Sequence, residues 1–265
     1  MPNNLTRYSS LIKKIRNWPL YWSRKFKDGY ESLEFITRNN RLRFRTPYKS
    51  LYLVFKEIFV DDVYRIDTLV KQLPQQPVVI DIGGNAGYFN LLLFNYLPNA
   101  RSIAYEPIEA NYKLFKYHID ANPALKGKLA VNHAAVVGQE QESVELFVET
   151  SASNSVTASI YEDFDRDNTF HVTVKAITLD QILRQNQLSH VDLLKVDCEG
   201  SEYPIIYESP EYVWQIVKKI IIEVHNLDEH QRNVESLQKY LETRGYTCSR
   251  NTLHNHCYML FACKN

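Results

Sequence analysis

The sequence is poor in cysteine and in long apolar runs. It has four cysteines among 265 residues, and Cys248, Cys257 and Cys263 form no C-x-x-C pair. This spacing indicates neither a disulfide framework nor a zinc knuckle. No apolar run reaches the roughly 18 residues that a membrane span needs, and Lys and Arg interrupt the start of the chain, so neither a membrane helix nor a signal peptide is predicted. We therefore expect a cytoplasmic protein.

The chain also has no net charge, because Lys plus Arg and Asp plus Glu both number 31. This balance argues against a general nucleic-acid binder, and we expect no DNA partner. The charge is uneven, however, since residues 1–50 carry twelve Lys or Arg against three acidic residues. Residues 5–27 combine helical apolar spacing with basic residues, which is typical of a peripheral membrane or partner-binding arm, and equally of a helix packed on the core.

The chain divides into two parts. Residues 33–46 form two alternating runs around Asn39 and Asn40, which predicts a β-hairpin. A helical stretch over residues 50–73 follows and ends at Pro74 and Pro77, a natural linker. We therefore predict residues 1–74 as a basic helix, a hairpin and lid-like helices, and residues 75–265 as the main domain.

In the main domain, apolar strands alternate with helices. Strands are expected at 78–84, 101–107, 129–137, 191–197 and 217–225, with a last antiparallel pair in the tail and a helix over 228–244 that stops at Gly245. Residues 143–149 and 171–177 alternate as an inserted hairpin would, and Thr178 is a candidate helix cap. This order predicts an α/β, Rossmann-like, doubly wound and mostly parallel sheet, in which ligands bind at the carboxyl ends of the strands.

The first of these strand ends is rich in glycine and begins with an acid. Its residues form the pattern D-x-G-x-N-x-G: Asp81, Gly83, Gly84, Asn85 and Gly87. Glycines allow a sharp turn close to a ligand, but Ile82 stands where the dinucleotide fingerprint has its first glycine. Because a carboxylate repels phosphate, we expect a ligand that carries positive charge.

The second strand ends in Glu106, followed by Pro107. A carboxylate at this place can accept hydrogen bonds from both hydroxyls of a ribose. A nucleoside that has no phosphates and carries a cation is therefore implied, and S-adenosylmethionine fits this description.

Two later strand ends carry further ionisable groups. Lys195, Asp197 and Glu199 alternate from the end of the fourth strand onward, and Glu223 and His225 end the fifth. Ionisable groups at the ends of buried strands are costly unless they are paired or used. They form either a salt-bridge cluster or a catalytic site.

The segments VVIDIGGNAGYF, YEP, ITLDQIL, VDLLKVDCEGSE and IIIEVH, in this order, resemble the FkbM-type S-adenosylmethionine-dependent methyltransferases. The resemblance covers about residues 50–264, including EIFVDDVY, and implies a seven-stranded methyltransferase fold. It implies that Asp81, Gly83, Asn85, Gly87 and Glu106 hold the cofactor. It also implies O-methylation of a sugar, glycan or secondary-metabolite hydroxyl, with a small molecule or glycan as the acceptor.

Methyl transfer to a hydroxyl needs a base or a metal. Asp197 and His225 are the candidate bases, Glu199 would orient them, and Lys195 would stabilise the alkoxide or the acid cluster. Alternatively, Asp197, Glu223 and His225 bind Mg²⁺. His254 and His256 alternate on a late strand; without a third ligand nearby, they indicate a surface or substrate-facing strand rather than a metal-ligand pair. An RNA ribose methyltransferase, a nucleotide-dependent oxidoreductase and a non-catalytic binding protein stay open as alternative functions.

Overall fold

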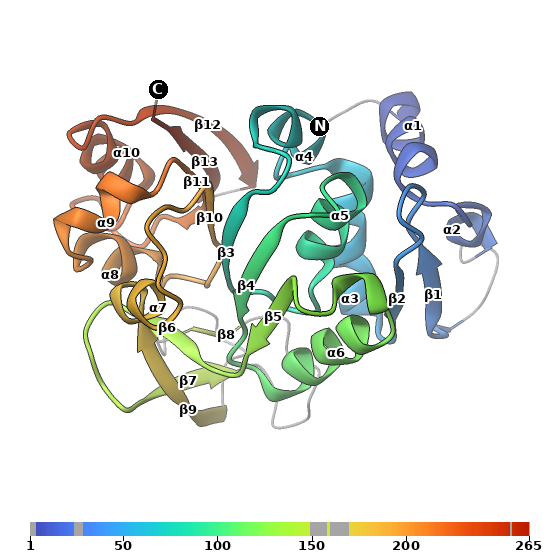
Figure 1. Ribbon diagram of the computed structural model, residues 1–265, viewed down its shortest axis with the longest axis horizontal. Coiled ribbons are helices and arrows are strands. Elements are labelled where there is room, and N and C mark those ends of the chain that lie inside the picture. Colours follow the sequence, from blue (N-terminus) through green and yellow to red (C-terminus); the bar gives the residue numbers. More distant parts are fainter. Residues whose placement is uncertain (1–3, 24–28, 149–157, 160–169, 255, 265) are drawn as a thin grey trace.

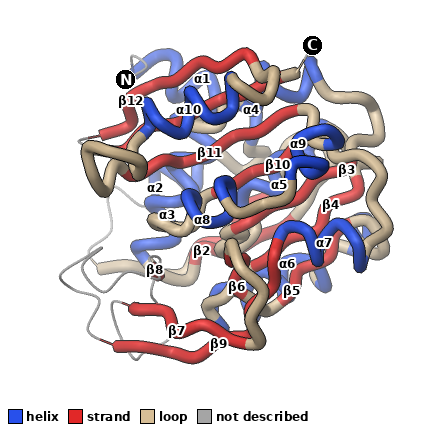
Figure 2. Tube along the Cα trace, turned by 90° about the vertical axis from the view of Figure 1, so that its left-hand side faces the viewer, coloured by secondary structure: helices blue, strands red, loops and turns tan. Residues whose placement is uncertain are grey.

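A sheet of seven strands runs through the middle of the protein (Figure 1). The structure is a computed structural model that describes residues 4–23, 29–148, 158–159, 170–254 and 256–264. The strand order is β12-β13-β11-β10-β3-β4-β5, and Figure 2 shows most of these strands one below the other. The strands are β3 (Val78–Ile82), β4 (Arg101–Tyr105), β5 (Leu129–Asn132), β10 (Leu193–Val196), β11 (Lys219–His225), β12 (Thr247–His254) and β13 (Cys257–Cys263).

All neighbouring pairs from β5 to β11 are parallel, whereas β13 is antiparallel to both β11 and β12. The predicted doubly wound, mostly parallel sheet with a final antiparallel pair is therefore confirmed. The last strand, β13, inserts between β11 and β12, so that β12 forms the edge of the sheet.

Each central strand is buried on both faces, because successive side chains enter two different cores. Val79 and Leu193 point into one core, and Ile80 and Leu194 point into the other. Figure 1 shows α5 and α6 on one side of the sheet and α8, α9 and α10 on the other. The helices of the main domain are α5 (Tyr88–Tyr96), α6 (Glu109–Asp120), the 3₁₀ turn η4 (Pro123–Leu125), α7 (Leu179–Gln185), α8 (Glu202–Tyr207), α9 (Glu211–Ile216) and α10 (Val234–Glu242).

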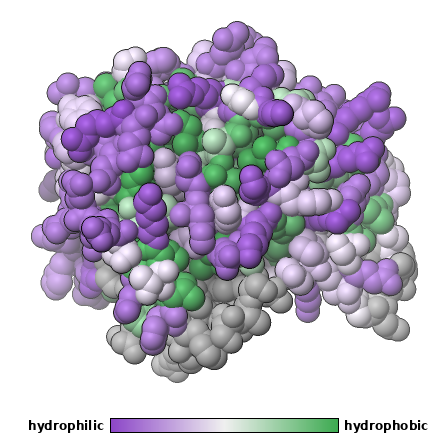
Figure 3. All heavy atoms as spheres, turned by 60° about the horizontal axis from the view of Figure 1, so that its bottom comes forward, coloured by the Kyte–Doolittle hydropathy of each residue, from purple (hydrophilic) through white to green (hydrophobic). Residues whose placement is uncertain are grey.

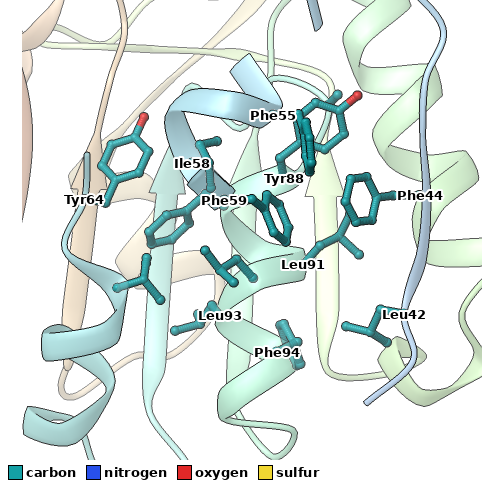
Figure 4. Packing of buried hydrophobic residues seen from close by; sticks show 14 of the residues in the cluster. Leu42, Phe44, Phe55, Ile58, Phe59, Tyr64, Tyr88, Leu91, Leu93 and Phe94 are labelled. Atoms are coloured by element: carbon teal, nitrogen blue, oxygen red, sulfur yellow. The ribbon is translucent and has the colours of Figure 1, made fainter. Parts of the chain in front are cut away.

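The N-terminal part packs on the α5 side. It consists of α1 (Asn4–Lys14), α2 (Pro19–Ser23) and the predicted hairpin, β1 (Leu33–Ile36) with β2 (Arg43–Thr46). Phe44 stacks on Phe59 with ring centroids 5.0 Å apart, and Phe55 lies close to both rings (Figure 4). Leu11 of α1 is also fully buried in this core. A membrane contact through residues 5–27 stays a prediction, although this apolar side chain of the segment faces inward.

The expected helix over residues 50–73 is broken into four pieces. These are α3 (Lys49–Phe55), the π-helix η2 (Lys56–Asp61), α4 (Ile66–Leu69) and the 3₁₀ turn η3 (Val70–Gln72). The break occurs where Asp62 and Arg65 adopt left-handed φ values of 52° and 51°. The Asp62 carboxylate accepts the backbone N–H of Ile66 at 2.9 Å and so starts a new helix. Tyr64 lies within this break.

Two further element predictions are wrong. The expected strand at 129–137 is two strands, because β5 pairs in the main sheet and β6 (Ala135–Val137) pairs with β9 in a second sheet. The helix expected from residue 228 starts only at Val234, since the Asp228 carboxylate accepts the N–H groups of residues 230–232 and Asn233 is the cap.

The inserted hairpin is confirmed. β7 (Ser143–Val148) pairs antiparallel with β9 (Phe170–Thr178), and β8 (Ala158–Ser159) pairs with β7. Thr178 caps α7, as predicted, through a reciprocal capping box with Gln181. Most of the polar insert between the two strands lies outside the described residues. Among the residues that the structure describes, no helix is long and apolar enough to cross a membrane.

Candidate active site

A cleft of about 1430 Å³ lies at the carboxyl ends of β3, β4, β10 and β11. Strand ends of the sheet form one side of it, and η2 and the break before α4 form another. Figure 3 turns the bottom of Figure 1 toward the viewer. On this face, hydrophobic residues (green) form patches between hydrophilic ones (purple). A cleft at this edge is where open α/β sheets bind their ligands.

The glycine-rich loop after β3 lies against the end of β10. Gly83 has a φ of +76°, and a Cβ there would stand 1.7 Å from the carbonyl oxygen of Asp197. Any side chain at this position would therefore push the two strand ends apart. Gly83, Gly84 and Asn85 line the cleft, and their role in cofactor binding stays a prediction.

Gly87 lies farther from the cleft than Gly83, Gly84 and Asn85. It lies outside the cleft lining, has a φ of +82°, and caps the start of α5. A Cβ at Gly87 would lie 2.3 Å from the Phe115 ring, so this glycine allows α5 and α6 to pack closely. Its presence in the motif reflects packing behind the loop.

Glu106 reaches across to the same loop. Its Oε2 accepts the backbone N–H of Asn85 at 2.7 Å, and its Oε1 accepts that of Ile108 at 2.8 Å. Only 4% of Glu106 is exposed, and burial raises its pKa to about 7, although the two N–H donors act in the opposite direction. Each oxygen of an ionised carboxylate has a second lone pair, so Glu106 can still accept two hydroxyl donors. Glu106 and Pro107 both line the cleft.

Asp81 is fully buried and is not part of the cleft lining. Its carboxylate lies 3.1 Å from the Lys195 Nζ and accepts the Asn90 amide at 2.5 Å. The cation that faces Asp81 is therefore Lys195, and the predicted direct contact with a positively charged ligand is not what the geometry shows.

Lys195 joins the two strand ends. Its Nζ donates to the Gly83 carbonyl at 2.6 Å and lies 3.4 Å from the Asp197 carboxylate. Burial lowers the pKa of Lys195, but Asp81 and Asp197 raise it more, so the net shift is upward. The ammonium is thus a fixed positive charge beside the cleft, as expected for a group that balances the acids.

Asp197 is one of the carboxylates that line the cleft. Its Oδ2 accepts a hydrogen bond from the Tyr64 hydroxyl at 2.5 Å. Tyr64 is itself buried, packs edge-on against Phe89, and belongs to the broken helix before the sheet (Figure 4). No spacing in the sequence marks Tyr64 as a site residue, and its one signal is the acidic-aromatic segment EIFVDDVY that contains it.

Glu199 does not continue the predicted alternation with Asp197. Its φ of 50° turns the chain after β10, and its carboxylate lies 3.3 Å from the His225 Nε2. Glu202, which is fully buried, and Glu223 lie 3.4 and 3.7 Å from the same imidazole. Glu199 therefore faces His225, as an orienting residue would.

His225 is held as a cation. Burial lowers its pKa, but the hydrogen bond with Cys257 and the carboxylates of Glu202 and Glu199 raise it to about 12. A protonated imidazole among three carboxylates cannot accept a proton, so Asp197 is the better of the two candidate bases.

Glu223 completes the acidic side of the cleft. Burial and the nearby Asp197 raise its pKa to about 8, against the opposite effect of His225. The predicted Mg²⁺ set of Asp197, Glu223 and His225 would require His225 to give up its carboxylate partners and its proton. The geometry gives no support to that set.

The sequence of the chain matches a family model described as the methyltransferase FkbM domain over residues 81–248. The chain therefore belongs to the FkbM methyltransferase family, and the predicted resemblance is confirmed. It is a methyltransferase, which sets aside the alternatives of an oxidoreductase and a non-catalytic binding protein.

Two curated relatives have similar lengths. The chain is 26% identical over 221 residues to methyltransferase sdnD of Sordaria araneosa, covering 75% of this chain and 83% of the relative. It is 26% identical over 208 residues to methyltransferase 1 of Beauveria bassiana, covering 73% and 80%.

Solved structures show a more distant likeness. Precorrin-6y C5,15-methyltransferase of Geobacter metallireducens is 15% identical with a TM-score of 0.46, covering 76% of this chain and 87% of that one. TrmK of M. capricolum, solved with S-adenosylhomocysteine, is 12% identical with a TM-score of 0.43, covering 76% and 68%. These likenesses concern the path of the chain and carry no argument about substrate.

Proposed function

We propose that the protein transfers a methyl group from S-adenosylmethionine to a hydroxyl of a sugar, glycan or secondary metabolite. The observation that carries this proposal is the Asp197 carboxylate, which lies in the cleft beside the glycine-rich loop and is held by Tyr64 and Lys195. A carboxylate at this place can act on the proton of an acceptor, and a hydroxyl needs such help because a neutral alcohol is a poor nucleophile.

The residues of the cleft fit the proposed cofactor. Glu106 has acceptor capacity for two ribose hydroxyls, and Gly83 and Gly84 line the cleft next to it. Asp197 and Glu199 give this part of the cleft a negative character that suits an ammonium and a sulfonium. When bound, S-adenosylmethionine supplies the electrophilic methyl group.

The chain's own groups would then act in distinct roles. Asp197 accepts the proton of the acceptor hydroxyl, and Tyr64 fixes its carboxylate through the 2.5 Å hydrogen bond. Lys195 stabilises the negative charge of Asp197 and keeps the two strand ends together. Alignment of the acceptor with the methyl group supplies much of the remaining rate enhancement, as in other two-substrate reactions.

The first test is calorimetric binding of S-adenosylmethionine to the full chain, with NAD as the comparison. A radiolabelled methyl donor is then offered with a panel of monosaccharides, phenols, amines and short RNA strands. We expect binding of S-adenosylmethionine alone and a methyl ether as the product, both with native protein and with the control variant Asp120→Asn, which changes an exposed acid of α6.

The other outcomes separate the alternatives. Label transferred to the ribose of RNA, with strong salt dependence, would favour the RNA ribose methyltransferase, for which the basic N-terminal segment and a Lys-Asp pair are the support. Label on the amines alone would overturn O-methylation, and a lack of S-adenosylmethionine binding would overturn the cofactor proposal.

A further inference from the structure

A carboxylate, an imidazole and a thiol lie together at the end of the cleft formed by β11, β12 and β13. Glu223, His254 and Cys257 each offer one ligand atom, and these atoms all lie within 4.8 Å of one another. Glu223 and His254 line the cleft, whereas Cys257 is almost fully buried behind them. The proposed methyl transfer uses none of these three side chains.

The sheet register explains how residues far apart in sequence meet. His254 of β12 and His225 of β11 both lie directly opposite Cys257 of β13, on either side of it. Directly opposite residues project from the same face of a sheet, and so does Glu223, two residues before His225. The register shift between Thr252 and His254 places the histidine opposite the cysteine.

The spacing of these atoms suits a tetrahedral ion. Zinc binds sulfur at about 2.3 Å and nitrogen or oxygen at about 2.0–2.2 Å, which places two ligand atoms of a tetrahedron about 3.3–3.8 Å apart. The Cys257 Sγ lies 3.3 Å from the Glu223 Oε1, to which it donates a hydrogen bond that a bound ion would replace. A ligand atom of His254 lies within 4.8 Å of both, so small side-chain shifts bring the three atoms to a tetrahedral spacing.

We propose that Glu223, His254 and Cys257 form a binding site for a zinc-like divalent cation. The thiol and imidazole select a borderline ion such as Zn²⁺ over Mg²⁺, which prefers oxygen ligands only. Three protein ligands leave a fourth position that opens toward the cleft, as in zinc sites that bind a water or a substrate. The site goes beyond the proposed function, because uptake of the ion does not require methyl transfer.

The test uses the untagged full chain, stripped of metal by a chelator and titrated with Co²⁺ and then with Zn²⁺. We expect one Co²⁺ per chain, an intense thiolate-to-cobalt charge-transfer absorption, and its loss when Zn²⁺ displaces the cobalt. Cys257→Ser should abolish this absorption, and His254→Ala should weaken Co²⁺ binding by at least about tenfold.

Matched variants control for the rest of the hairpin. Cys263→Ser changes another cysteine of β13, and His256→Ala changes the exposed histidine of the adjoining turn. Both should bind Co²⁺ as the native chain does. Circular dichroism checks that each variant folds, and the exposed position of His254 keeps the test valid if Cys257→Ser does not fold. A chain that takes up no Co²⁺ would overturn the proposal, as would binding that survives in both His254→Ala and a folded Cys257→Ser.

Discussion

The two ends of the cleft are built in different ways. The proposed cofactor end comes from two neighbouring βα units, in which Gly83, Asn85 and Glu106 follow strands that pair directly. The proposed acceptor end collects Tyr64 from before the sheet, Asp197 from its middle and His254 from its far edge. The first end depends on local turns, whereas the second depends on the whole fold being in place.

This difference implies that substitutions at the two ends should have separable effects. Changes at Glu106 should alter affinity for the cofactor, whereas changes at Asp197 and Tyr64 should alter the rate of transfer. A substitution that changed cofactor affinity and transfer rate equally would indicate that the two ends of the cleft do not act separately.

The largest effect is expected for Asp197→Asn. The amide keeps the size of the side chain and can still accept the Tyr64 hydrogen bond, but it cannot take a proton. We expect kcat to fall by about 10²–10⁴-fold, with S-adenosylmethionine affinity almost unchanged. Initial rates with an acceptor that the native chain methylates, together with calorimetry, measure both quantities. A kcat close to that of Asp120→Asn would rule out Asp197 as the base.

Glu106→Ala should have the next largest effect, and on binding. Loss of charge-assisted hydrogen bonds worth about 1.5–3 kcal/mol should weaken S-adenosylmethionine by about 10–100-fold. Glu109→Ala removes the same charge from an exposed position on α6 and is the matched control. Equal calorimetric affinities for the two variants would contradict the assignment of Glu106 to the ribose.

The sequence predicts the cofactor end better than the acceptor end for a physical reason. Strand ends such as Asp81 and Glu106 can be located from apolar runs, because neighbouring parallel strands end at the same edge of the sheet. Even there, periodicity does not reveal burial. The sequence therefore predicts a ligand contact for Asp81, although Lys195 neutralises this carboxylate inside the protein.

The contacts of the acceptor end cannot be predicted from the sequence, because they depend on irregularities of the backbone. Tyr64 enters the cleft only because left-handed residues break a stretch whose apolar spacing predicts one helix. Glu199 turns away from Asp197 because it also adopts a left-handed φ, of 50°. His254 comes close to Cys257 and Glu223 for two reasons. A register shift places it opposite Cys257, and β13 inserts between β12 and β11. None of these features leaves a periodic signal.

Tyr64→Phe tests how much the acceptor end relies on positioning. The ring should keep its packing on Phe89, while Asp197 loses the donor that orients it. We expect kcat to fall by about tenfold, since a lost hydrogen bond to a charged group is worth about 1.5–3 kcal/mol and only part of it orients the carboxylate. Tyr96→Phe is the matched control, because its hydroxyl donates to Asp67 at 2.8 Å outside the cleft. A KM effect with an unchanged kcat would contradict the positioning role.

The smallest effect is a pH dependence confined to the cofactor end. The pKa of Glu106 is about 7 in the folded chain, above its ordinary value of 4.5, so the side chain is neutral below this pH. For stability, the raised pKa favours the folded chain at low pH, and this contribution is lost as the pH rises from 4.5 through about 7. For binding the sign is opposite, because the ionised carboxylate is the stronger acceptor of the ribose hydroxyls.

S-adenosylmethionine affinity should therefore rise between about pH 6 and pH 8 and then level off, by at most tenfold per pH unit because a single proton is involved. Calorimetry across this range measures the slope, and repeating it in two buffers of different ionisation enthalpy counts the proton released. The Glu106→Ala chain, which lacks the titrating group, should show no such rise. If that variant kept the slope, the titrating group would lie among the acids of the acceptor end, and the separation between the two ends of the cleft would fail.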